Sequence, residues 1–350
     1  MMFDHFKPPP YVDAGPLAKL LDVTLRDGGF EVDFRWPSDH FAMVAETGHS
    51  TGVDVVELGY IGGVPLEHSV TRAGEGAYLT PAHIADARRD GLDLAAMIHP
   101  SALETQLDLE PFAAAGLAMV RLVYHPQWAV SIAALAAHAR QLGLTVAVNI
   151  ALASRYTSNE IVDHATTIAE DMAPDIIYIA DTCSAMTPDH VHYLVQRMRA
   201  EVDTDIGFHA HDFLNLAYAN ALAAVDAGAT YLDCSLLGLG RGGGNLAAEP
   251  LLLRHRLPDA DPAAAALLLN CRTELAETTG HQARPLVAAV CATLNLTPVE
   301  EQALREFAAL EHIDVDTAAL WLLTQASKVD SLRPQDLRDH WNQHAPVVRR

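Results

Sequence analysis

Cysteines, basic residues and long apolar runs are all scarce in this 350-residue sequence. The four cysteines, Cys183, Cys234, Cys271 and Cys291, have no Cys-x-x-Cys spacing, so we expect buried, reduced thiols of a cytosolic protein. Lys and Arg number 23 against 45 Asp and Glu, and this net charge of −22 argues against binding nucleic acid or an anionic membrane surface. No apolar stretch reaches the roughly 18 residues that a membrane span needs.

Other absences concern targeting and disorder. The first residues, MMFDHFKPPPYVDAGP, lack a basic start followed by an apolar core, so we expect no signal peptide and a cytoplasmic protein. Half of the residues are hydrophobic and no long low-complexity run is present, which argues against a disordered chain. The length suits two domains, or one large α/β barrel with an addition.

Short apolar or β-branched runs recur about every 30 residues, the size of one strand–helix unit. The eight runs begin near residues 20, 54, 92, 118, 144, 175, 204 and 230, and most are continuously apolar, as expected of covered parallel strands. Thr80-Pro81 and Thr187-Pro188 are typical of helix starts between them. Eight units predict a (β/α)8 TIM barrel, whereas the alternative, a doubly wound sheet, gives no reason for eight.

The strand signal ends after Glu249, and residues from about 262 to 342 are Ala- and Leu-rich with helical spacing. We therefore predict an N-terminal segment 1–19, a catalytic TIM barrel 20–255 and a helical C-terminal domain 256–350, joined through the stretch RLPDADP. Both a cover for the active site and a subunit interface fit the helical extension.

Polar residues gather at the ends of the predicted strands, where the active sites of TIM barrels lie. Arg26 and Asp27 follow the first run, Glu57 lies in the second, and Asp181 and Thr182 end the sixth. The other polar residues at these ends are Tyr60, His99, Tyr124, His125, Asn149, His209, His211 and Asn245.

The pair His209 and His211 is the most informative local feature. Residues two apart in a strand face the same side, so both imidazoles point to one site, where Asp27 can supply a carboxylate for a metal ion. Two exposed histidines in a chain with 18 of them are the alternative. Glu57 lies in the apolar run VVELGY, and because an unpaired buried charge is costly we expect it to hold the guanidinium of Arg26.

The glycine-rich loop GLGRGGGN, which ends at Asn245, follows the last predicted strand. Its N–H groups suit an anion, but it does not match GxxxxGK[ST], and a dinucleotide fingerprint would follow the first strand. A flexible lid, a loop that delivers Asn245 to the site and an ordinary glycine-rich loop all fit this sequence.

These motifs resemble the DRE-TIM metallolyases, which include hydroxymethylglutaryl-coenzyme A lyase, isopropylmalate synthase and 4-hydroxy-2-oxovalerate aldolase. The resemblance rests on DVTLRDGG at 22–29, VVELG at 55–59, IADTCSAM at 179–186, GFHAHD at 207–212 and the stretch from Asn215 to Glu249. It covers about residues 20–250, and the aldolase branch is the most similar.

The resemblance implies that Asp27, His209 and His211 bind a divalent cation such as Mn²⁺ or Mg²⁺, with Asn245 as a further ligand or a loop contact. A 2-oxo acid would chelate this cation, which acts as a Lewis acid.

The resemblance also implies that Arg26, held by Glu57, stabilises an enolate oxygen where its negative charge develops. Asp181 and Thr182 are the further residues that we expect to bind the substrate.

The sequence departs from the family pattern at Phe30. The hydroxy-oxovalerate aldolases carry an acid/base His at this position, whereas less characterised relatives carry LRDGGY, and Phe cannot move a proton. We assign this proton transfer to His125, with His99, Tyr124 and a metal-bound water as alternatives. The loop GLGRGGGN also lacks the Cys of the hydroxymethylglutaryl-coenzyme A lyases and the acidic residue of the synthases.

We therefore expect a metal-dependent aldolase, a carbon–carbon lyase that cleaves or forms 4-hydroxy-2-oxo acids through a pyruvate enolate stabilised by the metal and Arg26. The alternatives are a Claisen-type synthase that condenses an acyl-coenzyme A with a 2-oxo acid, and a catalytically altered relative in which Phe30 marks lost activity. The expected partners are a small 2-oxo acid, an aldehyde, further copies of the chain in a homo-oligomer, and a dehydrogenase that accepts a volatile aldehyde.

Overall fold

The computed structural model describes residues 18–64, 73–100, 102, 107–257 and 261–344. Among them, 18–49 and 53–248 form one compact unit, while 50–52, 249–257 and 261–344 belong to another. The predicted N-terminal segment 1–19 lies almost wholly outside the described residues, as do positions 258–260 of the predicted linker. The predicted domain boundary at residue 255 stays a prediction.

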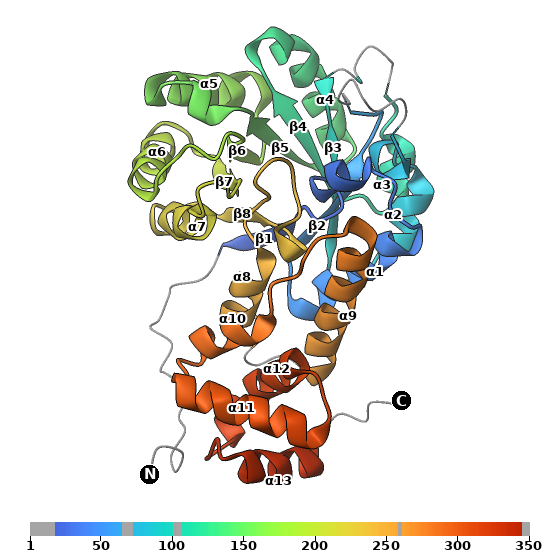
Figure 1. Ribbon diagram of the computed structural model, residues 1–350. Helices are drawn as coiled ribbons and strands as arrows, with labels where there is room; N and C mark the ends of the chain where they lie inside the picture. The colour runs from blue at the N-terminus through green and yellow to red at the C-terminus, as the bar shows by residue number, and fades with distance from the viewer. Residues whose placement is uncertain (1–17, 65–72, 101, 103–106, 258–260, 345–350) are drawn as a thin grey trace. The chain divides into compact units, whose positions relative to one another are not determined.

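Eight parallel strands close into a barrel in which each strand pairs with the next along the chain and β8 pairs with β1 (Figure 1). The strands are β1 Lys19–Asp22, β2 Val55–Tyr60, β3 Asp93–Ile98, β4 Met119–Tyr124, β5 Thr145–Ile150, β6 Ile176–Asp181, β7 Asp205–Ala210 and β8 Tyr231–Cys234. Each of the eight predicted runs contains one of these strands, so the predicted TIM barrel is confirmed.

A helix follows each barrel strand. These helices are α1 Asp39–Thr51, α2 Pro81–Ala87, α3 Glu110–Ala115, α4 Ala129–Gln141, α5 Ser158–Met172, α6 Pro188–Glu201, α7 Ala217–Asp226 and α8 Ala248–His255. Pro81 and Pro188 occupy the first helical position of α2 and α6, where their missing N–H costs no hydrogen bond. Thr80 and Thr187 stand at the N-caps, as predicted.

The interior of the barrel changes from apolar to polar along the strands. Its floor is a buried cluster that includes Val55, Met119 and Tyr231. Side chains two positions further along the same strands face the same interior. At these positions the strands carry buried charged residues: Glu57, Arg121 and Asp233. The core therefore gives way to a charged layer directly below the carboxyl ends of the strands.

The C-terminal unit is helical, as predicted. Its further helices are α9 Pro262–Thr279, α10 Leu286–Thr293, α11 Pro298–Glu311, α12 Val315–Gln325 and α13 Pro334–His344. The ring of Trp321 packs against those of Phe307 and Trp341, with centroids 5.3 and 5.1 Å away. A buried ion pair of 2.7 Å joins Arg272 to Glu249 within this unit.

The cysteines match the prediction except at one position. None of them forms a disulfide; Cys234, Cys271 and Cys291 are buried, whereas Cys183 is exposed. Cys183 follows β6 in the loop over the barrel end, so the expectation of a buried thiol was wrong there. Within the described part of the chain, no helix combines the length and the apolar character that crossing a membrane requires.

Candidate active site

The turn after β1 presents Arg26 and Asp27 at the carboxyl end of the barrel. It leads into a short 3-10 helix, Gly28–Val32, and both side chains are buried. A Cβ at Gly28 would lie 2.9 Å from Leu239, and one at Gly29 would lie 2.4 Å from the ring of Phe34. The two glycines are therefore needed for close packing on both sides of the turn.

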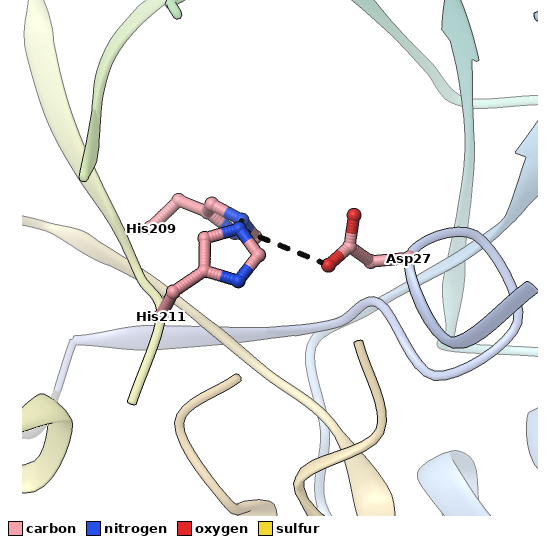
Figure 2. Close-up of side chains that lie close together, drawn as sticks. All are labelled: Asp27, His209 and His211. Carbon is pink, nitrogen blue, oxygen red and sulfur yellow. Dashed lines mark hydrogen bonds and ion pairs between the residues drawn. The ribbon is translucent and has the colours of Figure 1, made fainter. Parts of the chain in front are cut away.

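Asp27 faces the two histidines at the end of β7 (Figure 2). One potential ligand atom from each of Asp27, His209 and His211 lies within 4.8 Å of the others, and all three residues are buried. His211 Nε2 lies 4.0 Å from Asp27 Oδ2 and 3.3 Å from His209 Nε2. Burial and the neighbouring His209 lower the pKa of His211 to about 4, so this imidazole is neutral at pH 7.

The hydrogen bonds of the histidines direct both Nε2 atoms toward a shared ligand. His209 Nδ1 lies 2.9 Å from Asp233 Oδ2, and His211 Nδ1 lies 3.2 Å from the carbonyl oxygen of Gly244. Because both oxygens only accept, each Nδ1 carries a proton, and the Nε2 atoms of the two rings face each other. The two Nε2 atoms lie 3.3 Å apart beside the Asp27 carboxylate, and two imidazoles with a carboxylate form a common ligand set for a divalent cation. The three residues therefore fit a divalent metal ion.

Asn245 lies beside this cluster and holds Asp27. Its Nδ2 donates to Asp27 Oδ2 at 2.9 Å and to the carbonyl oxygen of Leu239 at 3.0 Å. Its Oδ1 is buried without a hydrogen-bond partner. Burial by itself would raise the pKa of Asp27, but Arg26 and the two histidines outweigh it and hold that pKa well below its usual range. Asp27 is thus an ionised carboxylate with a fixed orientation.

The guanidinium of Arg26 is clamped between two carboxylates. Its Nε donates to Glu57 Oε2 at 2.7 Å, and its Nη1 donates to Asp27 Oδ1. These bonds leave Nη2 outside both ion pairs. Tyr60 lies beside the guanidinium, and burial raises its pKa to about 12 against the opposing effect of Arg26, so the phenol stays protonated.

Two buried charges that the sequence reasoning missed continue this network. Arg121 donates from Nη1 to Glu57 Oε2 at 2.8 Å and from Nη2 to Asp233 Oδ2 at 2.6 Å. The same oxygen of Asp233 holds His209. A continuous path therefore runs from Asp27 through Arg26, Glu57, Arg121 and Asp233 to His209. We call this path the charge ring, because the two ends meet again at the candidate metal site.

An aromatic ring supports the charge ring from below. The guanidinium of Arg121 stacks over Tyr178 at 4.2 Å from the ring centroid. A Cβ at Gly207 would lie 2.4 Å from the same ring, so only glycine leaves room for it. The motif GFHAH thus supplies the space for Tyr178 as well as the two histidines.

A pocket of about 360 Å³ opens beside the charge ring. Six residues of the predicted site line it: Arg26, Asp27, His125, Thr182, His209 and His211. Glu57 and Asn245 are buried behind this lining and contact Arg26 and Asp27. The other lining residues include Phe30, Tyr60, Met97, His99, Tyr124, Trp128, Asn149 and Arg241.

Asp181 is not part of this lining. Its two carboxylate oxygens accept the backbone N–H groups of Ala185 and Met186, each at 3.0 Å. Asp181 therefore shapes the loop after β6, and these two hydrogen bonds account for its burial outside the pocket lining. Thr182 does line the pocket, where its hydroxyl also accepts the N–H of Leu152 at 3.1 Å.

Phe30 packs in the wall of the pocket. Its ring meets Phe34 and Tyr60 edge-on, at centroid distances of 4.8 and 6.4 Å. On another part of the wall, His99 and His125 both pack against Trp128, at 5.4 and 5.7 Å. The Nδ1 atom of His125 is buried without a hydrogen-bond partner. The pocket therefore offers imidazole groups although its position 30 carries none.

Replacing Arg121 tests the charge ring. Arg121→Met removes the charge between two buried carboxylates, so we expect the free energy of unfolding in urea to fall by about 3–5 kcal/mol. Arg35→Met is the control, because Arg35 pairs with Asp33 in solvent with 57% of its side chain exposed, and should cost about 1 kcal/mol or less. Equal unfolding midpoints for the two variants would contradict this account.

Residues 18–262 match the HMGL-like family. The curated relatives include 4-hydroxy-2-oxovalerate aldolase 2 of Nocardia farcinica, 32% identical over 234 residues that cover 66% of this chain and 66% of the relative. The 4-hydroxy-2-oxovalerate aldolase of Carboxydothermus hydrogenoformans is 31% identical over 237 residues, which cover 67% of this chain and 69% of that relative. The match thus spans about two thirds of the length of these relatives, whose names are those of lyases.

Solved structures with the same fold include the HMG-CoA lyase of Brucella melitensis, with a TM-score of 0.57 and 15% identity over 76% of this chain and 98% of that one. The carboxyl transferase domain of Rhizobium etli pyruvate carboxylase has a TM-score of 0.60 and 17% identity over 89% of this chain and 61% of that one. The predicted resemblance is confirmed, and with it the expectation of an enzyme: the chain belongs to the HMGL-like family.

Proposed function

We propose that this chain is a divalent-metal-dependent aldolase that forms or cleaves 4-hydroxy-2-oxo acids. The observation that carries the proposal is the meeting of the Asp27, His209 and His211 cluster with the clamped Arg26 in one pocket. Relatives about 31% identical are named 4-hydroxy-2-oxovalerate aldolases, which supports this reaction class.

Asp27, His209 and His211 would hold the metal ion, and Mn²⁺ or Mg²⁺ suits a site with a carboxylate and open positions for oxygen ligands. When bound, such an ion acts as a Lewis acid toward a 2-oxo acid. Asn245 would act on Asp27, because its amide already donates to that carboxylate.

Arg26 would stabilise the enolate of pyruvate. Its guanidinium is fixed by Glu57 and Asp27 before any substrate binds, so little reorganisation is needed when negative charge develops on the enolate oxygen. In cleavage, the C4 hydroxyl loses its proton, the C3–C4 bond breaks, and its electron pair forms the enolate while the aldehyde leaves. C3 then takes up a proton to give pyruvate.

His125 would move the proton at C3 in place of the residue that Phe30 replaces. It lines the pocket, and an imidazole there can carry a proton to or from a bound molecule. Thr182 lines the same pocket and would contact the substrate. The aldehyde partner, the homo-oligomer, the partner dehydrogenase and the cytoplasmic location stay predictions.

Exchange of the methyl protons of pyruvate tests the proposed function without an aldehyde. With Mn²⁺ in deuterium oxide, the protein should replace these protons by deuterium, measured by proton NMR, and a chelator should stop the exchange. Arg26→Met should slow it about 10²- to 10³-fold, because a preorganised donor at the enolate oxygen is lost. Arg35→Met, at an exposed residue outside the pocket lining, is the control. No exchange, or equal rates in the two variants, would count against the proposal.

The same assay tests the acid/base residue through two neighbouring histidines. His125→Gln should lower the exchange rate about 10²- to 10⁴-fold, the range for losing a general acid/base. His99→Gln is a matched control, because His99 lines the same pocket and packs on the same Trp128, and its rate should fall less than about tenfold. A larger loss in the His99 variant would overturn the assignment to His125.

A further inference from the structure

Arg241 brings a second positive charge to the pocket. It lies in the loop GLGRGGGN and lines the same pocket as Arg26. Its guanidinium stands 4.2 Å above the centroid of Phe30, close enough for a cation–π contact. The aromatic ring of Phe30 thus provides the surface on which this guanidinium rests.

The backbone of the loop is closely packed on the candidate metal site. A Cβ at Gly240 would lie 2.4 Å from Asn245 and 2.8 Å from Asp27, so glycine is required beside Arg241. On its other side, a Cβ at Gly243 would lie 2.6 Å from Phe213. The loop therefore holds Arg241 at the pocket between the metal-site residues and Phe213.

Arg241 differs from the other pocket guanidinium in its charge balance. Arg26 is neutralised by Glu57 and Asp27, whereas no carboxylate among the described residues forms an ion pair with Arg241. Burial and, after it, the charge of Arg241 lower the pKa of His99 on the pocket wall. An uncompensated cation therefore acts across the pocket of a chain whose net charge is −22.

We propose that Arg241 binds an anionic group on the aldehyde half of the substrate, so that the enzyme takes aldehydes that carry a carboxylate or phosphate. The proposal rests on the aldolase function proposed above. The 2-oxo acid half would have its own polar contacts at Arg26 and the metal site, whereas the Phe30 ring under Arg241 packs in an apolar cluster with Val64 and Met97. A neutral aldehyde would leave the Arg241 charge unpaired, whereas an anionic one forms a charge-assisted hydrogen bond with it.

The reaction is an aldol addition or its reverse. In the direction of synthesis the C3–H bond of pyruvate breaks, its electron pair forms the bond to the aldehyde carbon, and the aldehyde oxygen takes a proton. No oxidant or reductant takes part, and the anionic group on the aldehyde stays unchanged. The product carries two anionic groups, one for each end of the pocket.

The test compares aldehydes of equal length that differ in charge. With the Mn²⁺-loaded enzyme and pyruvate, kcat/KM is measured for succinic semialdehyde and for butanal, and glyceraldehyde 3-phosphate against glyceraldehyde tests a phosphate. We expect the wild-type enzyme to prefer the anionic member of at least one pair by about 10- to 100-fold. Whichever pair shows the preference identifies the anionic group.

Variants of Arg241 connect that preference to the residue. Arg241→Gln should remove most of the preference by lowering kcat/KM for the anionic aldehyde, while Arg241→Lys, which keeps the charge, should retain part of it. Arg197→Gln is the control, because Arg197 lies on α6, outside the pocket lining, and it should keep the wild-type preference.

The remaining outcomes distinguish a failure of the Arg241 inference from a failure of the proposed function. Pyruvate exchange without any preference for an anionic aldehyde, or a preference that Arg241→Gln leaves intact, would overturn this inference and leave the aldolase function standing. A loss of kcat/KM in Arg241→Gln that is equal for charged and neutral aldehydes would also overturn it. Absence of pyruvate exchange would overturn the proposed function itself.

Discussion

The ion pairs that Arg121 forms with Glu57 and Asp233 are the constraint on which the candidate site depends. Three charges with almost no access to solvent lie inside the barrel, and the two carboxylates reach out from there to Arg26 and His209. Removing water from these charges is costly, and their mutual attraction offsets that cost only while every member is present. The same contacts fix the orientation of the groups that face the pocket, so folding and preorganisation share one set of bonds.

The charge ring also bears on how a strongly acidic chain would bind the anions that we propose as its substrates. Glu57 and Asp233 are matched by Arg121, and Glu57 and Asp27 hold Arg26, so the acidic residues at the barrel end are used inside the protein. The net charge of −22 therefore says little about the field that a ligand meets. The local field in the pocket would be set by the positive groups that remain, the Arg241 guanidinium and the proposed metal ion at the histidines.

The sequence predicted the barrel because its strands are covered on one face by helices and read as continuous apolar runs. Side chains two positions apart in a strand point to the same face, which predicted that His209 and His211 lie together. A charge in an apolar strand needs a partner, which predicted the contact of Glu57 with Arg26. Arg121 in AMVRLVY and Asp233 in TYLDCSLL are charges of the same kind in apolar strands, and they pair with each other inside the barrel.

Other features depend on contacts that no local pattern reveals. Asp181 ends a strand as a catalytic residue would, but its carboxylate accepts two backbone N–H groups of the following loop. Asn245 reaches Asp27 across 218 positions of sequence, so only the closed barrel shows that its Nδ2 holds that carboxylate. The stacking of Arg241 on Phe30 likewise joins the first and last strand ends, which become neighbours when β8 pairs with β1.

The central claim is that the charge ring holds the proposed metal ligands in place, and the affinity for Mn²⁺ tests it most directly. Asp233 does not belong to the ligand cluster and acts through His209 Nδ1. In Asp233→Asn the dissociation constant for Mn²⁺, measured by calorimetric titration, should rise about 10- to 100-fold. Asp226→Asn, a change on the exposed face of α7, should leave it at the wild-type value. An unchanged Mn²⁺ affinity in Asp233→Asn would contradict the account.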